Sequence, residues 1–228
     1  ERGRRVAVVL DEFQEVVAID PGLMRLMRSV FQEQPDVAHV YLGSRRHMMA
    51  RIFDDENEPF WRSAKQMALG PIAPDLFVAY AAARFTQTAK ALGHAAAQGA
   101  LQITGGHPYA TQELLYFLWE ATAAGETAGE VELARALDAT LRSEHTHFSL
   151  LWERSAAAQR MVLQALAAEA PGHPLSGDYR RRHGLPSTAT VQTALAALVR
   201  AETVSREGRG TYVIAEPFLA GWITRLQS

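Results

Sequence analysis

The sequence contains no cysteine and only two lysines among its 228 residues. The absence of cysteine excludes a disulfide framework and any metal site built on thiolates. No apolar run approaches the roughly 20 residues that a membrane-spanning helix needs, so we expect no membrane partner. No charged and then apolar leader opens the chain, which favours a cytoplasmic protein.

The scarcity of lysine also excludes a phosphate-binding loop within these residues. Such a loop has the pattern Gly-x-x-x-x-Gly-Lys-Ser/Thr, and its lysine and backbone amides surround phosphate groups. Neither Lys65 nor Lys90 follows a glycine or precedes a serine or threonine. These residues therefore lack the main phosphate contacts of a site for a nucleoside triphosphate.

What the sequence does contain is enough apolar material for a folded core, since hydrophobic residues make up 48% of it. The net charge of -2 is unevenly spread. Residues 1–152 hold 14 basic and 19 acidic residues, whereas residues 153–228 hold 9 basic and 6 acidic ones. A mildly basic C-terminal part suits a nucleic-acid partner, although the excess is small.

The first part of the chain alternates apolar runs of strand length with helical patterns. This rhythm predicts an α/β layer with a parallel sheet, and short continuous apolar runs predict strands buried on both faces. The helix expected after the first strand has an apolar face of Leu23, Leu26, Met27, Val30 and Phe31. We expect strands at 5–10, 37–42 and 65–69 and a short helix at 47–53.

Helical patterns then replace the alternation, and the end of the chain has a third pattern. Three short helical stretches followed by two strands around the turn 207–210 predict a winged helix-turn-helix. The resulting domains are an α/β core at 1–73, a helical subdomain at 74–152 and a winged helix at 153–228. The helices are expected at 74–92, 94–102, 108–124, 130–145, 158–166, 176–183 and 187–202, and the last strands at 203–206 and 211–214.

Two adjacent carboxylates, Asp11 and Glu12, end the first expected strand. Ligands of open α/β sheets bind at the carboxyl ends of the strands. One carboxylate at that edge suits Mg²⁺, and the next suits a general base that takes a proton from water. A strand that simply ends in an acidic loop is the alternative interpretation of the same residues.

Five segments together resemble the archaeal-type ATPase family, a branch of the STAND group of AAA+-related P-loop NTPases, over nearly the whole chain. Residues 11–14, Asp-Glu-Phe-Gln, resemble its Walker B motif, and 41–44, Tyr-Leu-Gly-Ser, resemble its sensor-1 strand. The others are 59–72, which resemble an aromatic-Gly-Arg segment and the following strand, 104–109, which resemble the Gly-Gly-x-Pro signature of a helical lid, and 212–223, which resemble the end of its winged helix. Trp61 and Ser63 depart from the family pattern, and the glycine before the arginine is absent.

The resemblance implies a nucleotide-dependent switch that uses ATP and Mg²⁺. It implies that Asp11 holds Mg²⁺, that Glu12 is the catalytic base and that Ser44 lies beside the γ-phosphate. Arg62 would reach the γ-phosphate of a neighbouring subunit in a homo-oligomer, with a surface arginine or a partner for the acidic loop 54–58 as the alternative. Gly105, Gly106 and Pro108 would act at the nucleotide through backbone shape.

The family places its phosphate-binding loop ahead of the acidic strand. We therefore expect that loop upstream of Glu1 in the full-length protein, which would then be the ATP hydrolase. This chain alone is expected to be inactive and to hold ATP and Mg²⁺ weakly.

The expected winged helix carries polar side chains of the kind that contact DNA. Thr190 and Gln192 lie on the third helix, where short polar groups read base edges. The arginines at 180, 181, 182, 206 and 209 are candidates for phosphate contacts. Because winged helices also dock proteins, the alternatives to a nucleotide-driven switch are a DNA-binding regulator and a protein-interaction scaffold without hydrolysis.

Overall fold

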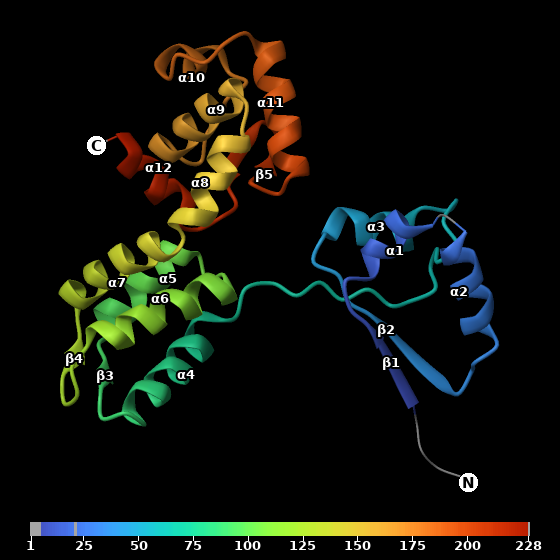
Figure 1. The fold of residues 1–228 in the computed structure, drawn as a ribbon, viewed down its shortest axis with the longest axis horizontal. Coiled ribbons are helices and arrows are strands. Elements are labelled where there is room, and N and C mark those ends of the chain that lie inside the picture. The colour runs from blue at the N-terminus through green and yellow to red at the C-terminus, as the bar shows by residue number, and fades with distance from the viewer. Residues whose placement is uncertain (1–5, 21, 228) are drawn as a thin grey trace. The chain divides into compact units, whose positions relative to one another are not determined.

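The computed structural model describes residues 6–20 and 22–227 (Figure 1). The chain divides into two compact units, Glu1–Leu69 and Gly70–Ser228. The predicted boundary between residues 73 and 74 lies four residues beyond this division. The further boundary at 152/153 stays a prediction.

The first unit contains a small parallel sheet of two strands with short helices around it (Figure 1). The strands run in register, with Val6 opposite Val37 and Leu10 opposite Tyr41. The expected strand at 5–10 is thus present from residue 6, and residue 5 lies outside the described residues. The elements are β1 (Val6–Leu10), a 3-10 helix (Phe13–Glu15), α1 (Val16–Ile19), α2 (Leu23–Gln32), β2 (Val37–Tyr41) and α3 (Arg46–Asp54).

Aromatic side chains form the core of this unit. Phe13 and Phe60 are fully buried, and their rings meet edge to face with centroids 5.2 Å apart. Tyr41 at the end of β2 brings its ring within 4.6 Å of that of Phe13 and 5.2 Å of that of Phe53. These contacts fix the segment that follows β1 against β2 and α3.

Two predictions for this unit are wrong in detail. Residues 65–69 form no strand, and Met67 and Leu69 are 82% and 78% exposed. In the part of the chain that the structure describes, no strand pairs with this segment. The strand β1 is not buried on both faces, since Val6 and Val9 are 52% and 56% exposed. Within the described residues the sheet has two strands, and no layer covers the outer valines.

The apolar face of α2 is also rotated from the predicted one. Met24 is the buried residue of this helix, with Met27 and Phe31 packed beside the core. Leu26 and Val30, both assigned to the inner face, are 61% and 42% exposed. The apolar residues of α2 form one wide stripe, and periodicity alone did not select which edge of that stripe is buried.

The second unit begins with four helices. The helix expected at 74–92 ends early at Thr86, because Ala89 adopts a positive φ of 55° and the amide of Lys90 turns back to the carbonyl of Phe85. The freed residues form a two-residue strand, β3 (Ala91–Leu92), which pairs in parallel with β4 (Thr127–Ala128). The helices are α4 (Pro74–Thr86), α5 (His94–Thr104), α6 (Pro108–Ala121) and α7 (Glu130–Ser143).

The winged helix-turn-helix predicted for the end of the chain is present. Its hairpin pairs Val204 with Ile214, and a further bridge joins Gly172 to Tyr212. Val191, Leu195 and Leu198 of the third helix are buried, whereas Val199 is 37% exposed. The elements are α8 (His145–Arg154), α9 (Ala157–Ala168), α10 (Gly177–Arg182), α11 (Thr188–Arg200), β5 (Val204–Gly208), β6 (Thr211–Ile214) and α12 (Leu219–Gln227).

One continuous apolar core runs through the second unit, from Phe77 of α4 to Ile223 of α12. The expected helix at 130–145 breaks at Glu144, which ends α7 and begins α8. None of the described helices combines the length and the apolar character that crossing a membrane would require.

Candidate functional site

The site of interest lies where β1 and β2 end side by side. The parallel ladder continues past both strands, because the amide of Leu42 donates to the carbonyl of Leu10 at 2.8 Å. The amide of Phe13 then donates to the carbonyl of Leu42 at 2.9 Å. These two bonds bring the residues after β1 next to those after β2, as expected for the carboxyl edge of a parallel sheet.

The four residues after β1 divide into an outward pair and an inward pair. Phe13 and Gln14 are buried, whereas Asp11 and Glu12 are exposed. Glu12 adopts a left-handed conformation with φ 49° and ψ 42°, which is uncommon for a residue with a side chain. This turn presents both carboxylates to solvent while the aromatic core holds the segment in place.

Glu12 is held by two side-chain donors. The hydroxyl of Ser44 donates to its Oε2 at 2.9 Å, and the Nε2 of Gln14 donates to the same oxygen. The bonds from Gln14 and then Ser44, together with the nearby charge of Arg45, lower the pKa of Glu12. The structure thus brings together Glu12 and Ser44, two of the predicted site residues, from positions 32 residues apart.

Asp11 lies beside Glu12, and its Oδ1 accepts the backbone amide of Glu12 at 2.9 Å. Exposed carboxylate and hydroxyl oxygens at this edge are the ligands that Mg²⁺ prefers. No cluster of three or more histidine, cysteine or acidic residues suited to a metal occurs in residues 6–20 and 22–227. Binding of Mg²⁺ at Asp11 stays a prediction.

Arg62 belongs to the same unit, in the segment after α3. Its backbone has a positive φ of 50°, and its amide donates to the carbonyl of Phe53 at 2.9 Å. The guanidinium lies 5.2 Å from the ring centroid of Trp61. Glu58 of the acidic loop pairs with Arg51 at 3.2 Å, and Arg62 is exposed, so its reach to a neighbouring γ-phosphate and the alternative of a surface arginine both stay predictions.

Gly105, Gly106 and Pro108 lie in the second unit, between α5 and α6. Both glycines have positive φ values, 59° and 72°, a conformation that favours glycine. Pro108 occupies the first turn of α6, and the Nδ1 of His107 accepts the amide of Ala110 at 3.4 Å. The local role of these residues is therefore to end one helix and start the next, and their action at a nucleotide stays a prediction.

The arginines of α10 are engaged within the winged helix. Arg180 donates through Nη1 to the carbonyl of Pro186 at 3.3 Å, and Arg181 forms an ion pair with Asp178. Arg182 pairs with Glu169 at 2.6 Å. Contact of these three guanidinium groups with phosphate stays a prediction, and it would have to compete with these bonds.

The other candidates in this domain are exposed. The hydroxyl of Thr190 hydrogen-bonds Ser187, the N-cap of α11, at 2.9 Å, and Gln192 faces solvent on the same helix. In the hairpin, Arg206 donates through Nε to the carbonyl of Gly208 at 3.0 Å. Arg206 and Arg209 are both exposed.

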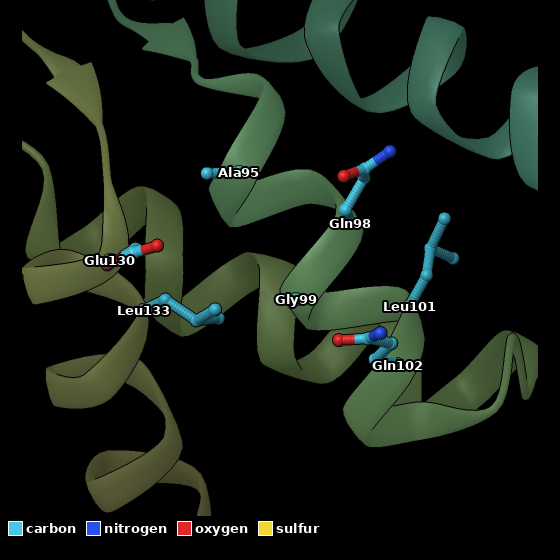
Figure 2. Close-up of a pocket in the computed structure, with 7 residues that line it drawn as sticks. All are labelled: Ala95, Gln98, Gly99, Leu101, Gln102, Glu130 and Leu133. Carbon is cyan, nitrogen blue, oxygen red and sulfur yellow. The ribbon is translucent and has the colours of Figure 1, made fainter.

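An open hollow of about 740 Å³ lies elsewhere, between α5 and α7 (Figure 2). Its floor is apolar, with Gly99 and Leu133 in contact range, and Gln98, Gln102 and Glu130 surround it. None of the predicted site residues lines this hollow.

Sequence analysis did not single out Gln14 or Gly43 as functional residues. Gln14 is completely buried and bonded to Glu12, and Gly43 packs directly on its side-chain oxygen. An amide two residues after a carboxylate pair and a glycine before Ser44 were the visible signals. The role of these two residues depends on the pairing of β1 with β2, which neither segment reveals by itself.

Comparisons with known proteins agree with this architecture. Residues 146–225 match the family model of a probable winged helix domain. A Walker-type ATPase from Pyrococcus abyssi has a similar structure, with a TM-score of 0.67 and 18% sequence identity. The similarity covers 96% of this chain but only 63% of the Pyrococcus chain. Among curated protein sequences no significant match was found. The chain therefore contains a winged helix domain and has a fold related to that of a P-loop ATPase.

Proposed function

We propose that the chain is part of an ATP-hydrolysing switch of the STAND and AAA+-related type, with the winged helix as its output domain. The observation that carries this proposal is the joining of Glu12 to Ser44 at the carboxyl edge of a parallel strand pair. A general base beside a small hydroxyl residue at that edge suits the hydrolysis of a phosphate anhydride. The family resemblance of residues 11–14 and 41–44 points to the same chemistry.

In this proposal each residue of the first unit has one role. Glu12 takes a proton from the water that attacks the terminal phosphate, and the hydrogen bonds from Gln14 and Ser44 that lower its pKa keep it in the ionised form. Asp11 holds Mg²⁺, which would neutralise charge on the phosphate oxygens. Ser44 donates a hydrogen bond to Glu12 and lies where a γ-phosphate contact is expected.

The exposed valines of β1 support a larger α/β core in the whole protein. Val6 and Val9 are more than half exposed, although strands of a parallel sheet are normally covered on both faces. Apolar surface of this kind is usually covered by further structure. The chain spans 63% of the Pyrococcus ATPase it resembles, so the activity of the whole protein is part of the proposal.

A second candidate function is DNA binding by the winged helix. The observation in its favour is the exposed pair Arg206 and Arg209 in a hairpin of the matched winged helix domain. The internal bonds of the α10 arginines weigh against a strong phosphate contact from that helix. A protein partner docked on the winged helix, without DNA, is the remaining alternative.

The upstream gene sequence and a measurement of ATP binding together test the ATPase proposal. The reading frame that encodes this chain should contain Gly-x-x-x-x-Gly-Lys-Ser/Thr roughly 60 to 100 residues ahead of Asp11, which leaves room for the loop, its helix and another strand–helix unit. The full-length product should bind ATP in calorimetry, and the 228-residue chain should bind it far more weakly. An upstream sequence without such a loop would remove the ATPase proposal.

A further inference from the structure

Among the described residues of the first unit, Gln14 is the one polar side chain that is completely buried. It sits in the 3-10 helix after β1, next to the aromatic core and to Met49. Its Nε2 donates to Glu12, while its Oε1 is buried without a hydrogen-bond partner. Burial of an amide with one end unpaired is unfavourable, so packing alone does not account for a glutamine at this position.

The orientation of the amide follows from its neighbour. The nitrogen faces the Glu12 carboxylate, because the reverse orientation would place two acceptors against each other. The hydroxyl of Ser44 donates to the same carboxylate oxygen, Oε2. Both donors therefore hold one oxygen, and Oε1 of Glu12 takes part in neither bond.

The position of the Gln14 amide is fixed from the other side by Gly43. A β-carbon added at Gly43 would overlap the Oε1 of Gln14 and the Sδ of Met49. Gly43 does not have a positive φ, so its small size and not its backbone freedom is what this contact uses. The segment after β2 thus supports the carboxylate twice, directly through Ser44 and indirectly through Gly43 and Gln14.

We propose that Gln14 is a positioning residue, whose buried amide holds the Glu12 carboxylate in the orientation required of a general base. Glu12 is exposed, and its side chain would otherwise sample several rotamers on a solvated turn. The buried amide of Gln14, held in place by its contact with Gly43, and the hydroxyl of Ser44 together restrict the rotamers of Glu12. The positioning role rests on the proposed function, but the pairing of the two side chains can be measured without nucleotide.

The first experiment records the side-chain amide resonances of Gln14 by NMR in the 228-residue chain. The resonances should lie apart from those of exposed Gln192 and exchange with solvent at least about tenfold more slowly. Glu12→Ala should shift the Gln14 resonance, because the acceptor is lost. Glu56→Ala, which removes an exposed carboxylate elsewhere in the first unit, is the control and should leave it unchanged.

Gly43→Ala supplies a second variant that leaves both bonding partners in place. Its methyl group should displace the Gln14 amide and move the same resonance. If the Gln14 resonance responds to neither Glu12→Ala nor Gly43→Ala, the two side chains are not coupled and the inference is overturned.

The second experiment compares wild type and Gln14→Met in the full-length protein. Methionine keeps the length and apolar packing of the side chain but has no N–H to donate. We expect kcat for ATP to fall roughly 10- to 100-fold with KM unchanged, since misplacing a reacting group slows the chemical step more than binding. An unchanged kcat overturns the positioning role.

The two experiments separate the inference from the proposed function. If Glu12→Gln abolishes hydrolysis and Gln14→Met does not change it, the ATPase stands and the positioning role is overturned. If the full-length wild type hydrolyses no ATP, the proposed function fails. The NMR measurement then still shows whether Gln14 holds Glu12.

Discussion

The hydroxyl of Ser44 donates a hydrogen bond of 2.9 Å to the carboxylate of Glu12, although 32 residues separate them in the chain. The parallel pairing of β1 with β2 brings the two together, and the ladder bonds at Leu42 extend that pairing to the site. The contact ties a candidate base to the next strand of the sheet. It therefore gives the acidic turn a defined geometry that an ordinary surface loop lacks.

Replacing Ser44 should change the titration of Glu12. The bond from Ser44 is the second-largest cause of the lowered pKa of Glu12, after the bond from Gln14. Ser44→Ala should therefore raise the pKa of Glu12 toward its ordinary value, as followed by ¹³C NMR of the carboxyl group. Ser29→Ala, which removes a hydroxyl bonded within α2, should not change it. An unaltered titration in Ser44→Ala would mean that this contact does not form in solution.

The second unit should lose stability as the pH rises from about 4.5 to about 7. Burial, and then the negative charges of Glu144 and Glu216, raise the pKa of Glu113 from 4.5 to about 7. The unfolded chain releases this proton near pH 4.5, whereas the folded protein keeps it until about pH 7, so stability falls between these values. Because Glu113 is partly solvated, we expect a loss of only about 1 kcal/mol.

Glu113→Gln should remove that dependence, with a higher unfolding temperature than wild type at pH 8 and little difference at pH 4. The measurement is thermal unfolding monitored by circular dichroism across this range. Glu120→Gln, an exposed carboxylate on the same helix, is the control and should behave like wild type. A Glu113→Gln variant with the wild-type pH dependence would contradict the assignment.

Tyr179 should contribute to the stability of the winged helix through its hydroxyl. The hydroxyl donates to the carbonyls of Ala165 and Glu169 at 2.8 and 3.0 Å, and burial raises its pKa to about 12. Tyr179→Phe leaves carbonyls at the end of α9 without this donor and should cost about 1–2 kcal/mol in denaturant unfolding. Exposed Tyr116→Phe should cost nothing measurable. Equal effects of the two variants would contradict the assigned role.

If the winged helix binds duplex DNA, the arginines of its hairpin should account for much of the dependence of DNA affinity on salt concentration. Removing Arg206 and Arg209 together should flatten the log–log slope of affinity against salt by about 2, one for each phosphate contact. Arg181→Gln and Arg182→Gln should change the slope less, because both guanidinium groups are paired with carboxylates. Fluorescence titration of the chain with labelled duplex provides the slopes. Absence of binding at low salt would leave a protein partner as the alternative.

The fold was predictable where the pattern is local. The carboxyl end of β1, the helices of the second unit and the hairpin at 207–210 follow from apolar spacing and turn residues. Burial was less predictable, because it depends on what lies against each face. The apolar run at 6–10 is a strand but exposes its valines, and residues 65–69 have strand composition without a strand to pair with.

The sequence predicted the two carboxylates of the candidate site but not the hydrogen bonds and contacts that hold Glu12 in place. Asp11 and Glu12 stand out because a strand delivers them, and the resemblance indicated Ser44. The bonds from Gln14 and Ser44 to one oxygen, and the contact of Gly43 with Gln14, require the register of β1 against β2. The ion pair of Arg182 with Glu169 likewise links residues from different elements.

ATP turnover by Glu12→Gln in the full-length protein tests the central claim most directly. The amide keeps the size and much of the hydrogen bonding of the carboxylate but cannot accept the proton, so the variant should bind ATP normally and hydrolyse it at least about 100-fold more slowly. Asp11→Asn in the same assay should instead require more Mg²⁺. Hydrolysis by Glu12→Gln at the wild-type rate would contradict the account, because the base would then lie elsewhere.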